Sequence, residues 1–210
     1  MRLVIAFTIV MGLTFGIACN DPAADQPKAT TGAATQASPA QQSVAGTKYV
    51  ITPQTSKVEF IGSKVTGSHN GAFEKFSGEI NYAGTPERSR VTVTMETDSL
   101  TTDDANLTKH LKTADFFDVA KFPQATFTST EIKPGGAGGS HTITGNLTLH
   151  GVTKSVTFPA TINVTPDVAN VDANFSINRK DFGINYAGAQ DNLIRDDVVL
   201  KLTIRAAKAS

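Results

Sequence analysis

The sequence predicts an all-β fold: a single antiparallel barrel of eight strands, with one short helix plugging one mouth. Thr, Val, Ile and Phe are plentiful and Trp is absent, a composition that favours strands. About eight segments alternate apolar and polar residues with a period of two, so each predicted strand offers one apolar face to a shared core. A single helical pattern interrupts them, and the mostly tight turns favour a closed barrel over two independent sheets.

The first 46 residues are predicted to lie outside this barrel. Met1 and Arg2 form a short positive start, and the apolar run from Leu3 to Ala18 has the length of a secretory signal rather than of a spanning helix. We therefore expect residues 1–18 to be a signal peptide. Residues 19–46 are rich in Ala, Thr, Gln and Pro and hold almost no large apolar residue, so they are predicted to form a disordered linker.

Cys19 is the only cysteine of the chain and stands at the end of the predicted signal. The motif Gly16-Ile17-Ala18-Cys19 resembles a bacterial lipobox, although Gly16 stands where Leu is common. The same small residues would also serve an ordinary signal peptidase, so export is expected by either route. A lone cysteine at the start of the mature chain favours lipidation, since no intramolecular disulfide can form. We expect a lipid-anchored protein on the periplasmic side of a bacterial membrane.

The predicted barrel domain spans residues 47–208. After a short strand at Tyr49–Ile51, Val58 and Phe60 share one face of the next strand, and residues 65–71 are interpreted as a turn region. The later strands are predicted from alternating apolar positions: Phe76, Ile80 and Tyr82; Val91, Val93 and Met95; Ala125 and Phe127; Ile143, Leu147 and Leu149; Val156, Phe158, Ile162 and Val164; Val171, Ala173, Phe175 and Ile177; Val198, Leu200, Leu202 and Ile204.

Turn signals connect these strands. The run Gly135–Gly139 is interpreted as a flexible hairpin connection, because no Lys-Ser/Thr pair and no helix follow it, as a phosphate-binding loop would require. Gly151-Val152 is interpreted as a type II′ hairpin turn. Pro159 lacks a backbone donor and therefore predicts an edge or a bulge in its strand.

The helical pattern lies between two of the predicted strands. Thr101 fits the N-cap of a capping box that has Asp104 at its N3 position. Leu107, Leu111 and Ala114 follow at helical spacing, which gives the helix one apolar face. An aromatic knot comes next: Phe116, Phe117, and Phe122, which Pro123 biases toward extended geometry. This helix and knot are predicted to plug one mouth of the barrel.

Several segments together resemble the YceI-like, polyisoprenoid-binding family. The most specific are His110-Leu111 with Asp115-Phe116-Phe117 and the block Leu147-Thr148-Leu149-His150-Gly151-Val152-Thr153-Lys154. The other matching segments are residues 56–60, 71–73, 76–78, 98–102, 122–123, 127–130, 145–146 and 178–183. The resemblance implies a lipocalin-like barrel, exported to the periplasm, that carries or stores a long isoprenoid lipid in its interior. The lipobox and linker are additions to the soluble form of that family.

Other classes of function are disfavoured. The formal net charge is zero, with 19 basic and 19 acidic residues, which argues against a nucleic-acid partner, because such a partner usually demands a basic face. No Gly-x-Ser-x-Gly nucleophile motif occurs, no catalytic residue is assigned, and the chain is not expected to be an enzyme. No metal and no cofactor other than the bound lipid are expected, because the four histidines lack the close spacing of metal ligands: His69, His110, His141 and His150.

The binding site is predicted to be the apolar interior of the barrel. Its expected lining is Phe60, Phe76, Ile80, Val93, Leu107, Leu111, Phe116, Phe117, Phe127, Leu147, Phe175, Phe182 and Leu200. Aromatic and aliphatic side chains with few polar groups suit an apolar ligand. The same side chains could instead fill the core completely, and the alternative function is then a non-catalytic interaction or stress-response module of the envelope. A homodimer also remains open as a partner.

Overall fold

The structure, a computed structural model, describes residues 21–39, 46–190 and 192–210. The predicted signal peptide and Cys19 lie outside the described residues. Within those ranges, no helix is long and apolar enough to cross a membrane.

The strands are β1 (Thr30–Ala33), β2 (Thr47–Ile51), β3 (Lys57–Lys64), β4 (Gly67–Phe73), β5 (Phe76–Tyr82), β6 (Arg90–Glu96), β7 (Leu100–Thr102), β8 (Gln124–Pro134), β9 (His141–Leu149), β10 (Val152–Val164), β11 (Val168–Asn178), β12 (Gly188–Ala189), β13 (Asn192–Leu193) and β14 (Asp197–Lys208). The helix α2 spans Ala105–Leu111, and short 3₁₀ helices span Pro86–Arg88 (η1), Thr97–Ser99 (η2) and Arg179–Phe182 (η3).

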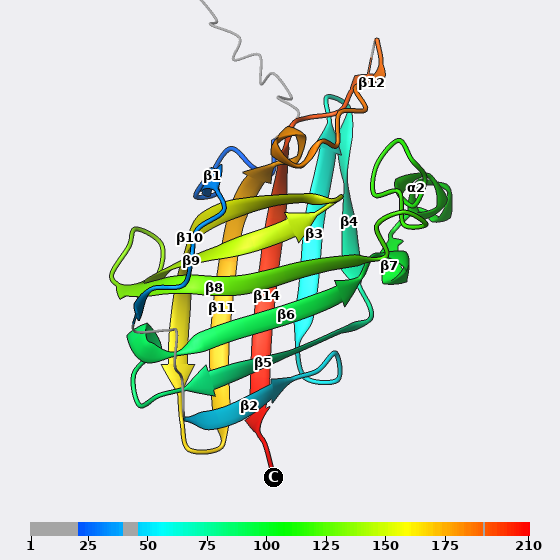
Figure 1. Ribbon diagram of the computed structural model, residues 1–210. Coiled ribbons are helices and arrows are strands. Elements are labelled where there is room, and N and C mark those ends of the chain that lie inside the picture. Colours follow the sequence, from blue (N-terminus) through cyan, green and yellow to red (C-terminus); the bar gives the residue numbers. More distant parts are fainter. Residues whose placement is uncertain (1–20, 40–45, 191) are drawn as a thin grey trace, which may run out of the picture.

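Eight strands close into an antiparallel barrel, as predicted, in the order β2-β5-β6-β8-β9-β10-β11-β14 (Figure 1). The ring closes where β14 pairs β11 on one side and β2 on the other. The register of β11 against β14 is unbroken, from Val168 opposite Ala207 to Asn178 opposite Asp197. Apolar residues on the inner faces of these strands form one continuous core.

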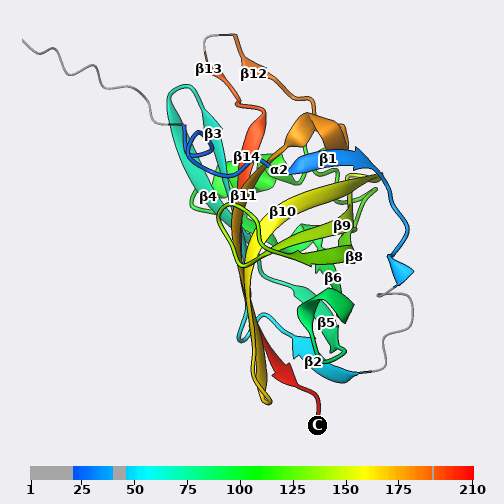
Figure 2. The same ribbon diagram turned by 90° about the vertical axis from the view of Figure 1, so that its left-hand side faces the viewer.

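The barrel is tighter at one end than at the other (Figures 1 and 2). At the end where β2, β5 and the C-terminus lie, β10 pairs with β11, but only over residues 161–164 and 169–172. Toward the opposite end the two strands separate, and no ladder joins the rest of β10 to the rest of β11. Pro159 lies at this separation, next to the last β10 residues that pair with β11, in keeping with the edge position its sequence predicts.

A second departure from a simple ring occurs along β14. Its far end pairs with β2 through Ala207 and Lys208, whereas residues 199–203 pair with β3. Between β2 and β3 the ladder is interrupted opposite Arg205. The Ser56 hydroxyl accepts the Arg205 N–H (3.0 Å) and the Thr55 hydroxyl donates to the Arg205 carbonyl (2.7 Å), so both backbone groups stay satisfied.

The strand β3 therefore leaves the ring and leads a flap of three strands, β3-β4-β7. The prediction of a turn over residues 65–71 was wrong here, because Gly67–Phe73 forms β4 and pairs with β3 from Lys64 opposite Gly67 to Glu59 opposite Ala72. The first half of β4 is polar and has no apolar alternation, which removed the sequence signal for a strand.

The helix α2 begins one turn later than predicted. Asp104, not Thr101, is its N-cap, because one Asp104 carboxylate oxygen accepts the N–H groups of Asn106 and Leu107, both at 2.8 Å. Thr101 and Thr102 instead extend the flap as β7. The helix ends at Leu111, so Ala114 belongs to the knot that follows it.

The hairpin between β9 and β10 also differs from the expected turn. Its two central residues are His150 (φ 51°) and Gly151 (φ 74°), and two positive φ values are the signature of a type I′ turn. The glycine is thus the second central residue rather than the first. His150 tolerates its left-handed backbone while its Nδ1 lies 3.2 Å from the Phe182 carbonyl oxygen.

The N-terminal segment of residues 21–39 is docked on the barrel, so the prediction of a disordered linker was wrong for this part. Strand β1 pairs with β10, from Thr30 opposite Thr157 to Ala33 opposite Lys154. On the other side, the Ala29 N–H donates to Ser176 of β11 (2.8 Å) and the Ser176 N–H donates to Pro27 (2.9 Å). The segment thus fills the gap between β10 and β11, where it hydrogen-bonds backbone groups that the barrel leaves unpaired.

Small residues make this docking feasible. Ala29 is 7% exposed and belongs to the apolar core, and its backbone lies close enough to β11 to donate a hydrogen bond to Ser176. Polar contacts hold the rest of the segment: Thr31 donates to Asp181 (2.6 Å), Lys28 pairs with Asp197 (2.8 Å), and the Asn146 side chain joins Thr35.

Replacing Ala29 with lysine should release this segment while leaving the barrel folded. A buried ammonium group without a partner is costly, and undocking avoids that cost. We expect the amides of residues 29–33 to exchange with deuterium at least about tenfold faster, equivalent to about 1.4 kcal/mol. The matched control is Ala34→Lys, at an exposed position of the same segment. Equal protection in Ala29→Lys and Ala34→Lys would contradict the docking.

Candidate ligand cavity and its mouth

The barrel encloses a cavity of about 540 Å³. Its lining is overwhelmingly apolar and comes from most strands of the ring, from the flap, and from α2 with the knot that follows. The volume lies within the range of about 300–1,000 Å³ that is typical of small-ligand sites. The barrel is therefore hollow rather than filled.

Most of the residues predicted to line a ligand site do border this cavity: Phe60, Val93, Leu107, Leu111, Phe116, Phe117, Phe127, Leu147, Phe175 and Leu200. Phe76, Ile80 and Phe182 are buried but do not border it. Phe76 and Ile80 lie on β5, and Phe182 lies in η3, where all three contribute to the core. Alternation identifies the inner face of a strand, but it does not say how far along the barrel axis the hollow part extends.

The same alternation contained further lining residues that the predicted site omitted. Val91, Ile143, Val156, Phe158, Ile177 and Ile204 all border the cavity. All six stand among the alternating apolar positions from which the strands were predicted, so the signal was present in the sequence.

The cavity stays open partly because large rings lie flat against glycines. A side chain at Gly71 would meet the Phe60 ring, whose nearest atom is 2.2 Å from an ideal Cβ. Gly71 is also the direct cross-strand partner of Phe60 in the flap. A Cβ at Gly145 would likewise meet the Phe127 ring at 2.3 Å. The missing side chains let both rings fold onto the sheet instead of crossing the interior.

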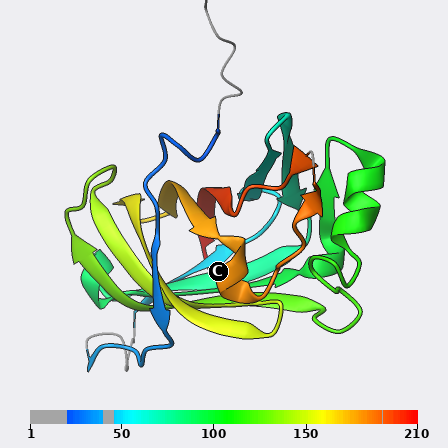
Figure 3. The same ribbon diagram turned by 90° about the horizontal axis from the view of Figure 1, so that it is seen from above.

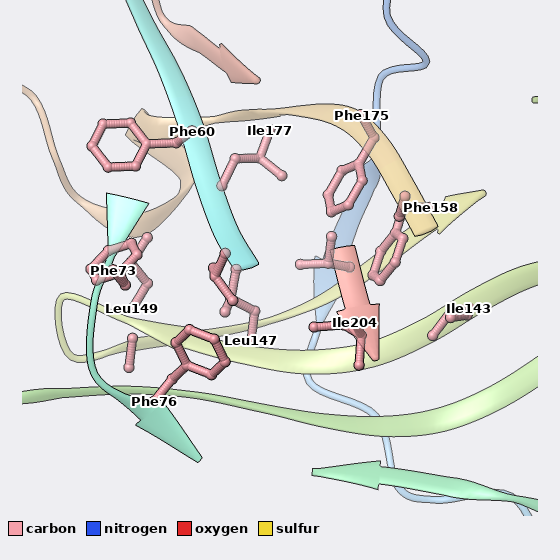
Figure 4. Close-up of a cluster of buried hydrophobic side chains, with 14 of the residues drawn as sticks. Phe60, Phe73, Phe76, Ile143, Leu147, Leu149, Phe158, Phe175, Ile177 and Ile204 are labelled. Carbon is pink, nitrogen blue, oxygen red and sulfur yellow. The ribbon is translucent and has the colours of Figure 1, made fainter. Parts of the chain in front are cut away.

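Two groups of packed aromatic rings form part of the cavity wall. Phe158 of β10 and Phe175 of β11 are nearly parallel, with ring centroids 4.2 Å apart (Figure 4). The Phe127 ring packs on Phe158 at a tilt, with centroids 5.8 Å apart. On the flap side, Phe73 lies between Phe60 and Phe117, at 5.9 Å from each. The second group connects the flap to the aromatic knot, so the knot is part of the wall.

The polar lining residues gather at one end, which is the mouth of the cavity. This end is surrounded by the β3–β4 hairpin, α2 and the β12–β13 hairpin (Figure 3). The residues are Ser63, Lys64, His69, Asp104, His110, Arg179, Tyr186 and Asn192. Sequence analysis did not assign them to the site, because no apolar periodicity marks residues of a rim.

Two histidine–aspartate pairs brace the α2 side of the mouth. His69 Nδ1 lies 2.8 Å from Asp103, and His110 Nε2 lies 2.7 Å from Asp115. The Asn70 N–H and the His69 side chain hold the pKa of Asp103 below its usual range. The first pair ties β4 to the turn before α2, and the second ties α2 to the knot.

An aromatic trio continues this side of the mouth. The His110 ring stands edge-on to Phe116 and to Tyr186, at 5.1 Å from each, and Phe116 lies 5.2 Å from Tyr186. Because His110 lies on α2 and Tyr186 precedes β12, the trio joins α2 to the opposite side of the mouth.

Arg179 fixes the loop that carries β12 and β13. It is 5% exposed, and its guanidinium donates to the carbonyls of Ile184 (2.7 Å) and Arg195 (3.0 Å), on the two sides of that loop. Burial lowers the pKa of Arg179, and the nearby Asp196 carboxylate opposes that effect. Because the guanidinium donates to backbone carbonyls on both sides of the loop, it holds the two sides together.

The other polar cluster of chemical interest lies away from the cavity. Ser140 Oγ is 2.7 Å from His141 Nδ1, and His141 Nε2 is 3.5 Å from Glu87. Ser140 Oγ also accepts the Ile162 N–H (3.0 Å), so the group pins the β8–β9 hairpin to β10. Neither Ser140 nor His141 borders the cavity, and within the described residues no cluster of three or more His, Cys, Asp or Glu could hold a metal.

Comparison with known proteins gives both sequence relatives and structural neighbours. A family model for the YceI-like domain matches residues 49–206. A UPF0312 protein of Pseudomonas putida strain W619 is 39% identical over 136 residues, which cover 61% of this chain and 70% of the relative. The matched domain begins after the docked N-terminal segment, so that segment is an addition to it.

Two solved structures share the fold. Burkholderia cenocepacia BcnA is 27% identical, with a TM-score of 0.66, over 74% of this chain and 99% of BcnA. A polyisoprenoid binding domain from Saccharophagus degradans, implicated in plant cell wall breakdown, gives a TM-score of 0.62 over 79% of this chain and 100% of that domain. At 16% identity the second likeness shows the fold alone.

Replacing Gly71 with alanine should narrow the cavity. The new methyl group would displace the far end of the Phe60 ring into the interior, and we expect binding of the apolar dye N-phenyl-1-naphthylamine to weaken at least about fivefold, or about 1 kcal/mol. Gly62→Ala is the matched control, because Gly62 also borders the cavity but a Cβ there has nothing within 4 Å. Dye titration alongside circular dichroism measures both effects. Equal affinity in the two variants would contradict a role for the Gly71–Phe60 contact.

Proposed function

The chain belongs to the YceI-like family, and from this premise we propose that it binds one long apolar lipid of the polyisoprenoid type inside its barrel and carries or stores it. The observation that carries the proposal is the hollow apolar interior of about 540 Å³, which opens at a polar mouth. The ligand class is supported by the polyisoprenoid binding domain of Saccharophagus degradans, which has the same fold. No catalytic step is part of the proposed function.

The size of the cavity limits how much of the lipid it holds. One water occupies about 30 Å³ of liquid and a methylene group is of similar size, so 540 Å³ accommodates on the order of 18 chain carbons. Each buried methylene contributes about 0.8 kcal/mol, so such a chain binds tightly without specific polar contacts. The packed rings of Phe127, Phe158 and Phe175 offer aromatic contacts to an unsaturated chain.

The alternative function, an interaction or stress-response module, requires a barrel whose interior is filled by its own side chains. The observed cavity disfavours that alternative.

The proposal places the protein outside the inner membrane of a bacterium, held to a membrane by a lipid on Cys19. It is supported by the apolar run Leu3–Ala18 and by the lipobox-like Gly16-Ile17-Ala18 that precedes the cysteine. Both features lie among the 48 residues that precede the part of the chain matched by the family model.

Affinity should depend on chain length up to the capacity of the cavity. In a series of isoprenoid alcohols from 10 to 45 carbons, we expect affinity to rise at least about tenfold per five-carbon unit up to about 20 carbons and then to level off. Titration calorimetry in dilute detergent measures the series, and native mass spectrometry of protein from its own envelope identifies the resident lipid. Absence of binding at every length would contradict the proposed function.

Filling the cavity should abolish binding without unfolding the protein. Val93→Trp adds a large apolar side chain to the lining, at an overpacking cost of about 1–3 kcal/mol. The control is Thr94→Trp, the next residue of β6, which does not border the cavity. We expect geranylgeraniol binding to be lost only in Val93→Trp, with both circular-dichroism spectra unchanged. Binding retained by folded Val93→Trp would place the ligand elsewhere.

Processing should leave an acylated Cys19 at the N-terminus. The expected result is an intact mass, after detergent extraction from membranes, equal to residues 19–210 plus a diacylglyceryl group, with or without an additional acyl chain. A mature chain that starts at Cys19 with a free thiol would refute the lipid anchor and leave export intact.

A further inference from the structure

Exposed apolar side chains gather around the mouth of the cavity. Among the described residues, four large apolar side chains are exposed, and three of them form what we call the apolar rim: Val65 (41% exposed), Tyr186 (38%) and Leu193 (50%). Val65 lies at the tip of the β3–β4 hairpin and Leu193 on β13, and the Val65 N–H donates to the Leu193 carbonyl (3.1 Å). Two hairpins thus present their apolar residues side by side.

The apolar rim is continuous with the cavity. Tyr186 itself borders the cavity, as do Lys64 and Ile194, the immediate neighbours of Val65 and Leu193. Lys64 and Ile194 also form a bridge between the two hairpins. An apolar surface that would contact the rim therefore also meets the opening through which a ligand enters.

The described chain begins at this same end of the barrel (Figure 1). Asp21 pairs with Arg195 at 3.1 Å, and Arg195 lies two residues after Leu193. From Asp21 the docked segment runs along the gap between β10 and β11, away from the mouth. Cys19 is only two residues before Asp21 in the sequence, and two residues of chain span at most about 7 Å.

We propose that the apolar rim docks on the surface of a lipid bilayer, with the mouth of the cavity facing the membrane. The inference rests on the proposed lipid anchor: docked residues 21–39 hold the anchor point beside the rim, whereas a free linker would let the barrel take any orientation. Two or more weak apolar contacts with a membrane reinforce each other, so rim and anchor together fix one orientation. A lipid then passes between bilayer and cavity by direct contact.

The orientation can be measured with a fluorophore at each end of the barrel. The acylated protein is purified as the variants Leu193→Cys and Val50→Cys, labelled with bimane, and reconstituted into phosphatidylethanolamine–phosphatidylglycerol vesicles that contain a nitroxide-labelled lipid. Val50 is the matched control, because it is exposed to a similar extent (38%) but lies on β2 at the opposite end. We expect quenching by the nitroxide lipid to be at least threefold stronger at position 193 than at position 50.

Three outcomes would overturn the proposal. Equal quenching at the two positions would mean that the barrel has no preferred orientation, and stronger quenching at position 50 would reverse it. A label at position 193 that is shielded from aqueous iodide without vesicles would assign the rim to contact with a second copy of the chain.

A transfer experiment tests whether the docked mouth is used. The double variant V65D/L193D places two charges on the rim, and neither residue borders the cavity. We expect transfer of a fluorescent farnesol analogue to vesicles to slow at least fivefold, with unchanged equilibrium affinity, while Val50→Asp transfers at the wild-type rate. Equal rates in V65D/L193D and wild type would overturn transfer through the rim. If no isoprenoid of any length binds, the proposed function fails, whereas the quenching experiment still tests the docking on its own.

Discussion

Unpaired backbone at the wider end of the barrel is the constraint on which the rest of this structure depends. A closed ring satisfies every strand, but a ring that widens toward one end separates its strands and exposes hydrogen-bonding groups. The protein meets this need twice. Residues 27–33 insert between β10 and β11, and β3 takes over the edge of β14 where β2 ends. Where β14 changes partner from β2 to β3, the hydroxyls of Thr55 and Ser56 hydrogen-bond the backbone carbonyl and N–H of Arg205.

The flap that begins at this break builds the mouth. Once β3 has left the ring, β4 and β7 continue the flap and lead to α2 and the aromatic knot, which lie beside the open end of the barrel. The flap also determines where α2 begins. Thr101 and Thr102 pair with β4 as part of β7, so Asp104 is the residue that accepts the first helical N–H groups. The break in strand pairing opposite Arg205 of β14 therefore determines where a ligand can enter.

The sequence predicted the ring and most of the cavity wall, because inner-face alternation is a local property of each strand. It failed where position depends on distant partners. The polar first half of β4 is a strand only because β3 lies beside it, and residues 21–39 dock because two separated strands offer them hydrogen bonds. Small residues such as Ala29 carry almost no hydrophobic signal, although Ala29 is buried. Phe76 and Phe182 show a second limit of prediction from sequence. Their burial could be predicted, but whether they border the cavity could not.

Because the cavity is smaller than a long lipid, the surroundings of its mouth affect how tightly such a lipid binds. A lipid with more than about 18 chain carbons exceeds what 540 Å³ can hold, and each methylene left in water forfeits about 0.8 kcal/mol. A ten-carbon excess in water would thus give up on the order of 8 kcal/mol, more than half of the roughly 14 kcal/mol that 18 buried methylenes contribute. If the mouth lies against a bilayer, the excess stays in hydrocarbon and that loss does not arise. The apolar rim and the proposed anchor beside it would then let a cavity of this modest size serve the proposed ligand, which is longer than the cavity.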